Sequence, residues 1–447
     1  MAKREDIILK YADKRLPRYT SYPTAPNFSP SVTAADYETW LAALNPDEPI
    51  SLYLHVPFCR DMCWYCGCNT KATRRTEPVE QFADSLLAEI DLIASLLPAQ
   101  MKVSHVHWGG GSPTYLAPTR FTQLMDRLRA RFDVTKDAEI AIEIDPRHMT
   151  PALAETYRAA GVARASLGVQ TFEPRVQAAI NRLQDAEMVS GAVDLLRAAG
   201  VAGLNFDLIY GLPFQTVDNC RASVREALRF SPDRLSVFGY AHVPHFKPHQ
   251  KLIREADLPD ASARLAQAIA IAEELETAGY VSIGLDHYAK ADDSLAVAHA
   301  RKRLHRNFQG YTTDNASAIL GFGPSAIGWL PQGYVQNTPA TAEWERRVLA
   351  GETPIARGCA LTAQDRFRRD IIETLMCHLE ADVAAISAKH GLAAPEPDLS
   401  SFLNEGIVAK ENSTVRVHED YRPLVRNVAA AFDAYLPAST AKHSVAV

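Results

Sequence analysis

Four of the seven cysteines stand close together in the segment LHVPFCRDMCWYCGCN, at positions 59, 63, 66 and 68. Their spacing is C-x3-C-x2-C-x-C, and it follows a short apolar run that is typical of a strand. Clustered thiolates on one loop are ligands for zinc or for an iron-sulfur cluster. Structural zinc sites usually draw ligand pairs from separate segments, and we assign no second C-x2-C pair and no H-x3-H pair as a partner. The spacing therefore favours an iron-sulfur cluster, although it differs from the four-ligand runs of ferredoxins, and three ligands would leave one iron free to bind a substrate or cofactor.

Strand-like and helix-like segments alternate along the chain and must position this loop. Short apolar or β-branched runs lie at 51–57, 103–111, 139–146, 164–170, 203–213 and 234–244, and 280–289 is a candidate for a further strand. Helix-period segments between them include 79–97, 185–200 and 261–279. This alternation predicts βα units and an α/β fold with a parallel sheet, and an open or closed barrel fits it better than a doubly wound sheet. Chemistry is expected at the carboxyl ends of the strands.

Segments outside these units divide the chain further. Residues 1–50 form a predicted N-terminal arm, in which the prolines and aromatics of PRYTSYPTAPNFSP favour an extended conformation. Residues 51–340 form the predicted barrel with the cysteine loop. Residues 341–447 form a small, mainly helical domain, in which 407–419 has the spacing of a β-hairpin wing. Winged-helix units often bind DNA, but this one lacks a strong basic face, so we expect it to pack on the barrel as a lid.

Composition and charge narrow the class of protein. A chain of 447 residues with 47% hydrophobic residues can bury a large core. The net charge of -6 argues against a general binder of nucleic acid or membrane surfaces. No apolar run approaches the about 20 residues of a membrane span, and the start MAKREDIILK lacks the apolar core of a secretory signal. We therefore expect a cytoplasmic protein, a monomer by default, whose cysteines stay reduced.

The motifs together resemble a known family. LYLHVPFCRDMCWYC is similar to the signature of the radical S-adenosylmethionine (SAM) superfamily, in which three cysteines hold a [4Fe-4S] cluster and the remaining iron chelates SAM. From about residue 17 to about 436, the chain resembles the oxygen-independent coproporphyrinogen III oxidases, through Cys68 and the segments PRYTSYPTA, HWGGGSPTYL, GVQTFEPRVQAAINRLQ, NFDLIYGLP, FGYAHVP, DHYAKADDSLAVA and LHRNFQGYTT.

The resemblance implies roles for individual residues. The cluster ligands would be Cys59, Cys63 and Cys66, with Cys68 a neighbour that tunes or shields the site or is only a small buried side chain. Contacts to the cluster-bound SAM would come from Tyr53, Tyr65, Gly110, Glu143 and Ile327. A second SAM would be bound by Gly111, Ser112, Gln170, Arg182, Asp207 and Ala241. The Arg182 guanidinium can clamp a carboxylate with two hydrogen bonds, although each residue taken alone also fits a structural role.

The resemblance also implies the reaction. The reduced cluster would cleave SAM to a 5'-deoxyadenosyl radical that takes a hydrogen atom from a propionate of coproporphyrinogen III. Loss of carbon dioxide and of one electron to an unknown acceptor would leave a vinyl group, and an electron donor must reduce the cluster. The substrate is polyanionic, so basic residues become candidates for binding it: Arg18 in the arm, and Arg301, Arg303 and Arg306 in the dense run HARKRLHRNFQ, for which a solvated helix face is the alternative.

Three other functions stay open at this point. A haem-trafficking chaperone of the same superfamily would share the loop and barrel, but Cys68, the PRYTSYPTA arm and NRLQ resemble the oxidases. A radical SAM methyltransferase or haem-degrading relative would use the second SAM differently. A zinc protein is the third alternative.

Overall fold

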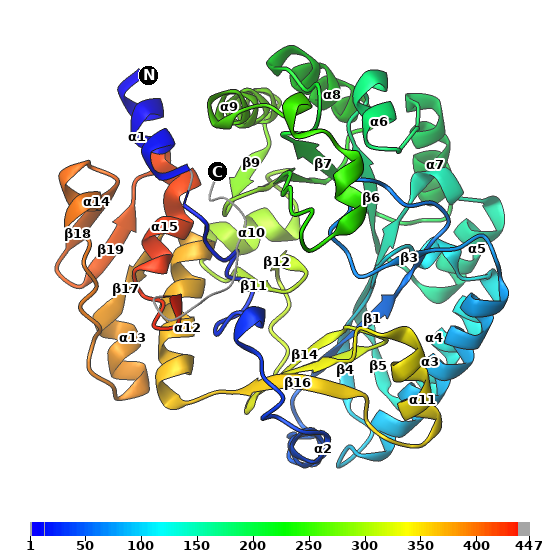
Figure 1. Cartoon of the computed structure of the whole chain (residues 1–447). Helices are drawn as coiled ribbons and strands as arrows, with labels where there is room; N and C mark the ends of the chain where they lie inside the picture. The colour runs from blue at the N-terminus through cyan, green and yellow to red at the C-terminus, as the bar shows by residue number, and fades with distance from the viewer. Residues whose placement is uncertain (1, 13, 437–447) are drawn as a thin grey trace.

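The computed structural model describes residues 2–12 and 14–436 (Figure 1). The last residues of the predicted C-terminal domain, 437–447, lie outside the described residues. The strands of the central sheet are β1 (Ile50–Val56), β4 (Lys102–Gly110), β5 (Asp133–Ile144), β6 (Arg164–Gln170), β7 (Gly203–Tyr210), β8 (Arg234–Gly239), β9 (Val281–Ile283), β10 (His287–Ala289), β13 (Ile319–Phe322), β14 (Ile327–Leu330), β15 (Gly333–Asn337) and β16 (Ile355–Ala360).

These strands form one sheet in the order β16-β15-β14-β13-β1-β4-β5-β6-β7-β8-β10-β9. Pairing is parallel from β13 through β8. Antiparallel strands extend the sheet at both ends. Among the described residues β16 and β9 stand at the two ends, so the sheet is open; the predicted α/β barrel with a parallel sheet is confirmed, and of the open and closed forms it has the open one.

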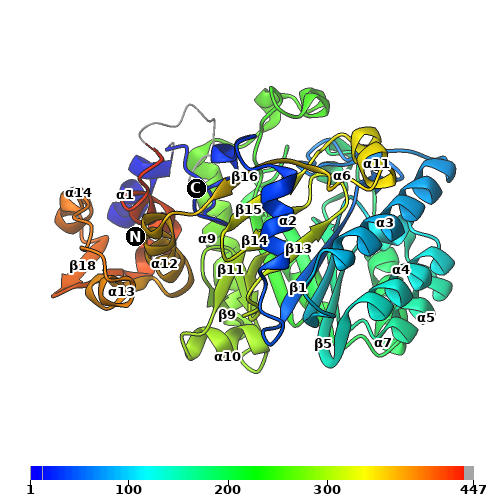
Figure 2. The same ribbon diagram turned by 90° about the horizontal axis from the view of Figure 1, so that it is seen from below.

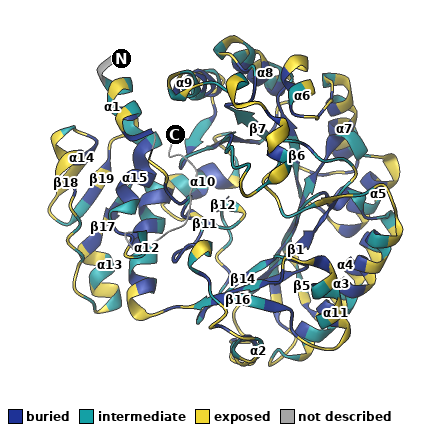
Figure 3. Ribbon diagram, viewed as in Figure 1, coloured by how far each residue is buried: buried dark blue, intermediate teal, exposed yellow. Residues whose placement is uncertain are grey.

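Helices cover the outer face of the parallel strands (Figure 1). They are α3 (Glu77–Ser95), α4 (Pro118–Arg131), α5 (Pro151–Ala160), α6 (Pro174–Ala179), α7 (Ala186–Ala198), α8 (Val217–Arg229) and α9 (Ala261–Thr277). In α3 the buried residues Val79, Phe82, Leu86, Ile90 and Ile93 recur at helical spacing, which gives one apolar stripe. Figure 3 shows the resulting pattern, with buried strands inside and exposed surfaces on the outer sides of the helices.

The sequence analysis predicted one further strand at 280–289, but the structure divides this segment into two strands. It forms β9 and β10, which pair with each other in antiparallel fashion. The chain turns between them at Gly284, whose φ is +56°, and the Tyr311 ring fills the space where a Cβ at that position would lie. A reversal of the chain at a glycine is therefore the reason that the run divides.

The chain beyond the barrel builds a second core. It contains α12 (Ala363–His378), α13 (Val383–His390), α14 (Ser400–Asn404), α15 (Val425–Ala430) and a small sheet in the order β17 (Glu380–Asp382), β19 (Thr414–Val417), β18 (Val408–Glu411). Strands β18 and β19 pair as the predicted hairpin. Figure 2 shows α1 (Ala2–Ala12) beside these elements, and Ile8 and Tyr11 are buried in the same core. The sequence analysis assigned no helix to this first segment.

The arm and the segment after residue 340 both join the barrel sheet. Ser29 forms an isolated bridge with Gly358 of β16, and α2 (Ala34–Ala42) leads from the arm into β1. Helix α11 (Thr341–Leu349) and β16 continue the barrel layers past the predicted boundary at residue 340. The division into an arm, a barrel and a C-terminal domain stays a prediction. No helix in residues 2–12 and 14–436 has the length and apolar character needed to cross a membrane.

Candidate functional site

The cysteine loop leaves the carboxyl end of β1 and is closed by two short parallel strands, β2 (Phe58–Cys59) and β3 (Lys71–Ala72). The Lys71 amide donates to the Pro57 carbonyl at 2.9 Å, which fixes the two ends of the loop side by side. Between these ends, the carbonyls of Met62, Tyr65 and Cys66 accept hydrogen bonds from Asn181 at 2.9 Å, Gln250 at 2.9 Å and His249 at 2.8 Å. The loop backbone is therefore held from outside.

A cavity of about 230 Å³ lies against this loop. Of the predicted site residues, it is lined by Cys59, Cys63, Tyr65, Cys66, Cys68, Gly110, Gly111, Glu143, Gln170, Arg182 and Asp207. Gly110, Glu143 and Gln170 lie at or next to the carboxyl ends of β4, β5 and β6, and Asp207 lies in the adjacent β7. Because parallel strands end at one edge of the sheet, residues far apart in the sequence meet around the cysteines.

The thiols of the loop differ in environment. Burial raises the pKa of Cys59 to about 12, although the Thr70 hydroxyl lies 3.2 Å from its sulfur. Hydrogen bonding from Cys68 lowers the pKa of Cys66, and the Cys68 amide donates to the Cys66 sulfur at 3.4 Å. Cys68 itself is exposed, so it is not a small buried side chain.

The donor set fits an iron-sulfur cluster. All seven cysteines are free thiols, and four of them, the three predicted ligands and Cys68, line one cavity from a loop whose backbone is already held. In the part of the chain that the structure describes, no group of three or more Cys, His, Asp or Glu side chains is arranged to hold a metal ion. Soft thiolates around a cavity suit a multinuclear cluster, and two guanidiniums beside Cys63 would offset its negative charge.

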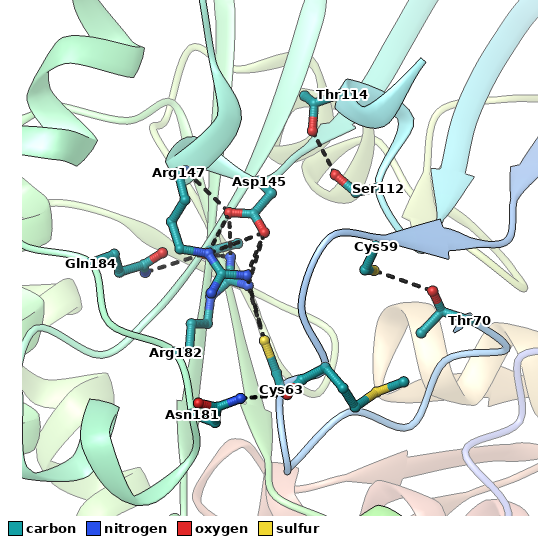
Figure 4. Close-up of polar contacts among 12 residues, drawn as sticks. Cys59, Cys63, Thr70, Ser112, Thr114, Asp145, Arg147, Asn181, Arg182 and Gln184 are labelled. Atoms are coloured by element: carbon teal, nitrogen blue, oxygen red, sulfur yellow. Dashed lines mark hydrogen bonds and ion pairs between the residues drawn. The ribbon is translucent and has the colours of Figure 1, made fainter. Parts of the chain in front are cut away.

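Those guanidiniums belong to Arg147 and Arg182, which share the carboxylate of Asp145 (Figure 4). Arg147 approaches Asp145 at 2.6 Å and Arg182 at 3.4 Å. Arg182 also donates to the Gly168 carbonyl at 2.5 Å and lies 3.5 Å from the Cys63 sulfur. Burial would raise the pKa of Asp145, but the charges of the two arginines outweigh it and hold that pKa below its ordinary value. Arg182 therefore enters the cavity as part of a buried ion cluster.

Glu143 faces the glycine turn after β4. Its carboxylate accepts a hydrogen bond from the Gly110 amide at 3.1 Å and lies 3.4 Å from His107. Gly110 has φ +111°, and a Cβ there would come within 2.7 Å of the His55 ring. Only glycine meets both conditions without strain. The turn is thereby shaped so that backbone groups reach the cavity.

Asp207 is held by two neighbours on the inner face of the sheet. Its carboxylate accepts hydrogen bonds from the Ser166 hydroxyl and the Asn205 amide, both at 2.9 Å. Burial raises the pKa of Asp207 to about 6, with the Ser166 hydrogen bond opposing the shift. This carboxyl group can therefore accept from, or donate to, a polar ligand near neutral pH.

Four predicted SAM residues do not line this cavity. Tyr53 is stacked on His107, with ring centroids 5.9 Å apart. Ser112 is buried, with its hydroxyl 2.5 Å from that of Thr114. Ala241 lines a different cavity, and Ile327 packs beside Phe28 and Tyr334.

The four predicted substrate arginines are divided by the structure. Arg301 and Arg303 are exposed in the turn after α10 (Ser294–Ala300) rather than on a helix face. Arg306, in β11 (His305–Asn307), is buried and donates to the Arg18 carbonyl at 3.2 Å. The structure therefore brings Arg18 and Arg306 together and leaves the other two on the surface.

The sequence analysis missed several residues of the site. Asp145 and Arg147 follow Glu143 at the end of its strand, and this strand-end position was the available signal. His245 and His249 form an H-x3-H pair that was overlooked as a possible zinc half-site, and the His249 ring is bonded to the Cys66 carbonyl. Ser166 alternates with buried residues of β6 and gave no distinct signal.

Comparisons with known proteins agree with this geometry. Residues 53–227 match the model of the radical SAM superfamily. The chain is 52% identical to an oxygen-independent coproporphyrinogen III oxidase of Bradyrhizobium diazoefficiens, over 99% of this chain and 100% of the relative. It is 42% identical to the protein of the same name from Paracoccus denitrificans, over 97% of each chain.

A solved structure extends the likeness to three dimensions. The coproporphyrinogen III oxidase of Escherichia coli, described as a radical SAM enzyme, superimposes with a TM-score of 0.89 at 38% identity, covering 94% of this chain and 100% of that one. Likeness of sequence and fold over nearly the whole length, together with the loop thiols that line one cavity at the strand ends, shows that this chain belongs to the oxygen-independent coproporphyrinogen III oxidases of the radical SAM superfamily.

Proposed function

We propose that this protein decarboxylates two propionate side chains of coproporphyrinogen III to vinyl groups without oxygen, giving protoporphyrinogen IX in haem biosynthesis. The observation that carries this function is the single cavity that joins the cysteine loop to polar residues at strand ends, in a chain that matches coproporphyrinogen III oxidases from end to end. When bound, a [4Fe-4S] cluster and SAM supply a carbon radical that removes a hydrogen atom from the propionate β-carbon. Each vinyl group then requires loss of one carbon dioxide and of one electron to an acceptor.

The residues of the loop and the strand ends bind and orient these groups. Cys59, Cys63 and Cys66 hold the cluster, and Arg147 and Arg182 balance its charge beside Cys63. The first SAM is bound by Tyr53, Tyr65, Gly110, Glu143 and Ile327. A second SAM is bound by Gly111, Ser112, Gln170, Arg182, Asp207 and Ala241. Most of these residues line the cysteine cavity, which supports both assignments. The support is weakest for Ser112, whose hydroxyl is buried against Thr114, and for Ile327, which packs beside Phe28 and Tyr334.

The reaction needs two redox partners besides the tetrapyrrole. A donor must deliver one electron to the cluster for each SAM cleaved, and an acceptor must take one electron from each substrate radical. We further propose that the protein works as a monomer in the cytoplasm, where free thiols such as these stay reduced.

An anaerobic product assay tests the function. The cluster-loaded protein is incubated with dithionite, SAM and coproporphyrinogen III, and products are measured by mass spectrometry. We expect carbon dioxide, methionine, 5'-deoxyadenosine and protoporphyrinogen IX. S-adenosylhomocysteine with a methylated tetrapyrrole would instead indicate a methyltransferase, and stable haem binding without decarboxylation would indicate a chaperone. Either result would overturn the proposed function.

A further inference from the structure

A second cavity, of about 380 Å³, adjoins the cysteine cavity across the end of β8. Phe238 lines the cysteine cavity, whereas the next residues, Gly239, Tyr240 and Ala241, line the second one. The wall also includes Tyr210 of β7, α9, and parts of the N-terminal arm and of the C-terminal segment. The end of β8 therefore contributes to the walls of both cavities.

The inner wall of the second cavity carries a cluster of buried and half-buried positive charges. It is lined by Arg18, Arg264 and Arg426, and Arg306 lies behind it in contact with the Arg18 backbone. The carboxylate facing these groups is that of Asp286, which already forms a hydrogen bond with the His287 ring, with 2.7 Å between Oδ1 and Nδ1. The other acidic residues of the wall are Glu273, Glu419 and Asp420, which pair with Arg221, Arg422 and Arg4, and Glu276, which is exposed.

The guanidiniums act on one another as like charges. Burial lowers the pKa of Arg264, and the charge of Arg18 lowers it further. Burial also lowers the pKa of Arg426 to about 10, with Arg18 and Arg306 contributing. Like charges held together away from water are unfavourable unless an anion compensates them.

Hydrogen-bonding capacity is left over in the same place. Arg264 donates through Nη1 to the Tyr240 carbonyl at 2.9 Å, but its buried Nε has no partner among the described residues. Arg306, which lines a neighbouring cavity and not this one, likewise has Nε and Nη1 buried without a partner in the described part of the chain. Buried N–H groups are nearly always paired in native proteins, so these donors are available to a bound acceptor.

Backbone contacts keep the arginines in position. Arg426 donates to the carbonyls of Leu16 and Pro17, the two residues before Arg18. Arg18 in turn donates to the Gly239 carbonyl at 3.3 Å and lies over the Phe238 ring. The arm therefore brings Arg18 to the boundary between the two cavities.

We propose that Arg18 and Arg264 form a carboxylate-binding subsite, supported by Arg306 and Arg426, that holds a non-reacting propionate of the tetrapyrrole while another propionate faces the cysteine cavity. This assignment rests on the function proposed above. Guanidinium groups bind carboxylates through paired, charge-assisted hydrogen bonds, and the apolar wall of Leu265, Ala268 and Ile269 suits the edge of a macrocycle. The carboxylate of SAM has the same chemistry, so the test must separate the two sources.

The test compares Arg264→Gln, Arg264→Lys and Arg18→Gln with the wild type. Arg229→Gln is the matched control, because Arg229 is an exposed arginine of α8 that pairs with Glu226. Binding of coproporphyrin III to the cluster-loaded protein is followed by fluorescence, and binding of SAM by calorimetry. We expect each Gln variant to bind coproporphyrin III about tenfold or more weakly, the loss typical of one charge-assisted hydrogen bond. The affinity of Arg264→Lys for coproporphyrin III should lie between those of Arg264→Gln and the wild type, and the affinity of all variants for SAM should equal that of the wild type.

Two results would overturn the subsite. If both Gln variants bind coproporphyrin III as tightly as the wild type, the arginines do not bind a propionate. If the Gln variants bind SAM more weakly but coproporphyrin III equally well, the arginines bind the carboxylate of SAM instead. Arg18 is only half-buried on the arm, so Arg18→Gln keeps the test valid if an Arg264 variant does not fold. A wild type that binds coproporphyrin III but does not decarboxylate coproporphyrinogen III would refute the proposed function and leave the subsite standing.

Discussion

Replacing Asp145 by asparagine should destabilise the cluster-free protein strongly. This carboxylate lies between two guanidiniums, with N–O distances of 2.6 Å to Arg147 and 3.4 Å to Arg182, and all three side chains are about nine-tenths buried. Asparagine keeps the shape but removes the negative charge, so two like charges would remain buried without compensation. Breaking a buried ion pair in this way costs about 3–5 kcal/mol of unfolding free energy.

Urea denaturation of the cluster-free chain, followed by circular dichroism, measures the change. Asp61→Asn is the control, because Asp61, in the cysteine loop, forms an exposed pair with Arg74 at 2.7 Å. An exposed pair contributes about 0–1 kcal/mol, so this variant should unfold close to the wild type. The reasoning is refuted if Asp145→Asn also unfolds within about 1 kcal/mol of the wild type.

Three further predictions follow from other parts of the structure. Gly110→Ala should weaken SAM binding at least tenfold in calorimetry, because a Cβ would meet the His55 ring at 2.7 Å, whereas Gly161→Ala, which has positive φ but nothing within 4 Å, should leave it unchanged. Burial raises the pKa of Glu89 to about 7, so its protonated form stabilises the fold below about pH 4.5 and this stabilisation is lost as the pH rises through about 7. The wild type should therefore lose up to about 3 kcal/mol relative to Glu89→Gln between pH 4.5 and pH 8, and parallel urea-midpoint curves would contradict this. Deleting residues 1–30 removes Arg18 and should abolish most decarboxylation while the cluster absorbance is retained; unchanged turnover would show that the arm has no role in catalysis.

Local patterns were sufficient for the repeating part of the fold. Strand β7 is buried along most of its length, and its run of apolar residues is typical of a parallel strand covered on both faces. Helix α3 repeats its apolar residues at helical spacing. By contrast, β9 and β10 looked like one strand, because alternation alone does not reveal a reversal at Gly284.

The charge run at residues 299–309 shows a different limit. Its composition suggested one basic surface, but the backbone separates its members. Arg301 and Arg303 stay in solvent, whereas in β11 the side chains alternate, with His305 exposed and Arg306 buried. A list of neighbouring arginines therefore does not tell which of them share a site.

The sequence by itself determined the cysteine loop, the βα order and the family, because each depends on residues close together or on motifs in a fixed order. Only the tertiary structure decided that Asp145 lies between Arg147 and Arg182, and that Arg18, Arg264 and Arg426 meet at one cavity. Arg182 is distant in sequence from Asp145 and Arg147, and Arg18, Arg264 and Arg426 come from three distant segments, so each alone resembles an ordinary surface charge. The strand ends, the arm and the last helices bring these charges together only when they pack, and the resulting concentration of guanidiniums at the second cavity supports the proposed carboxylate subsite.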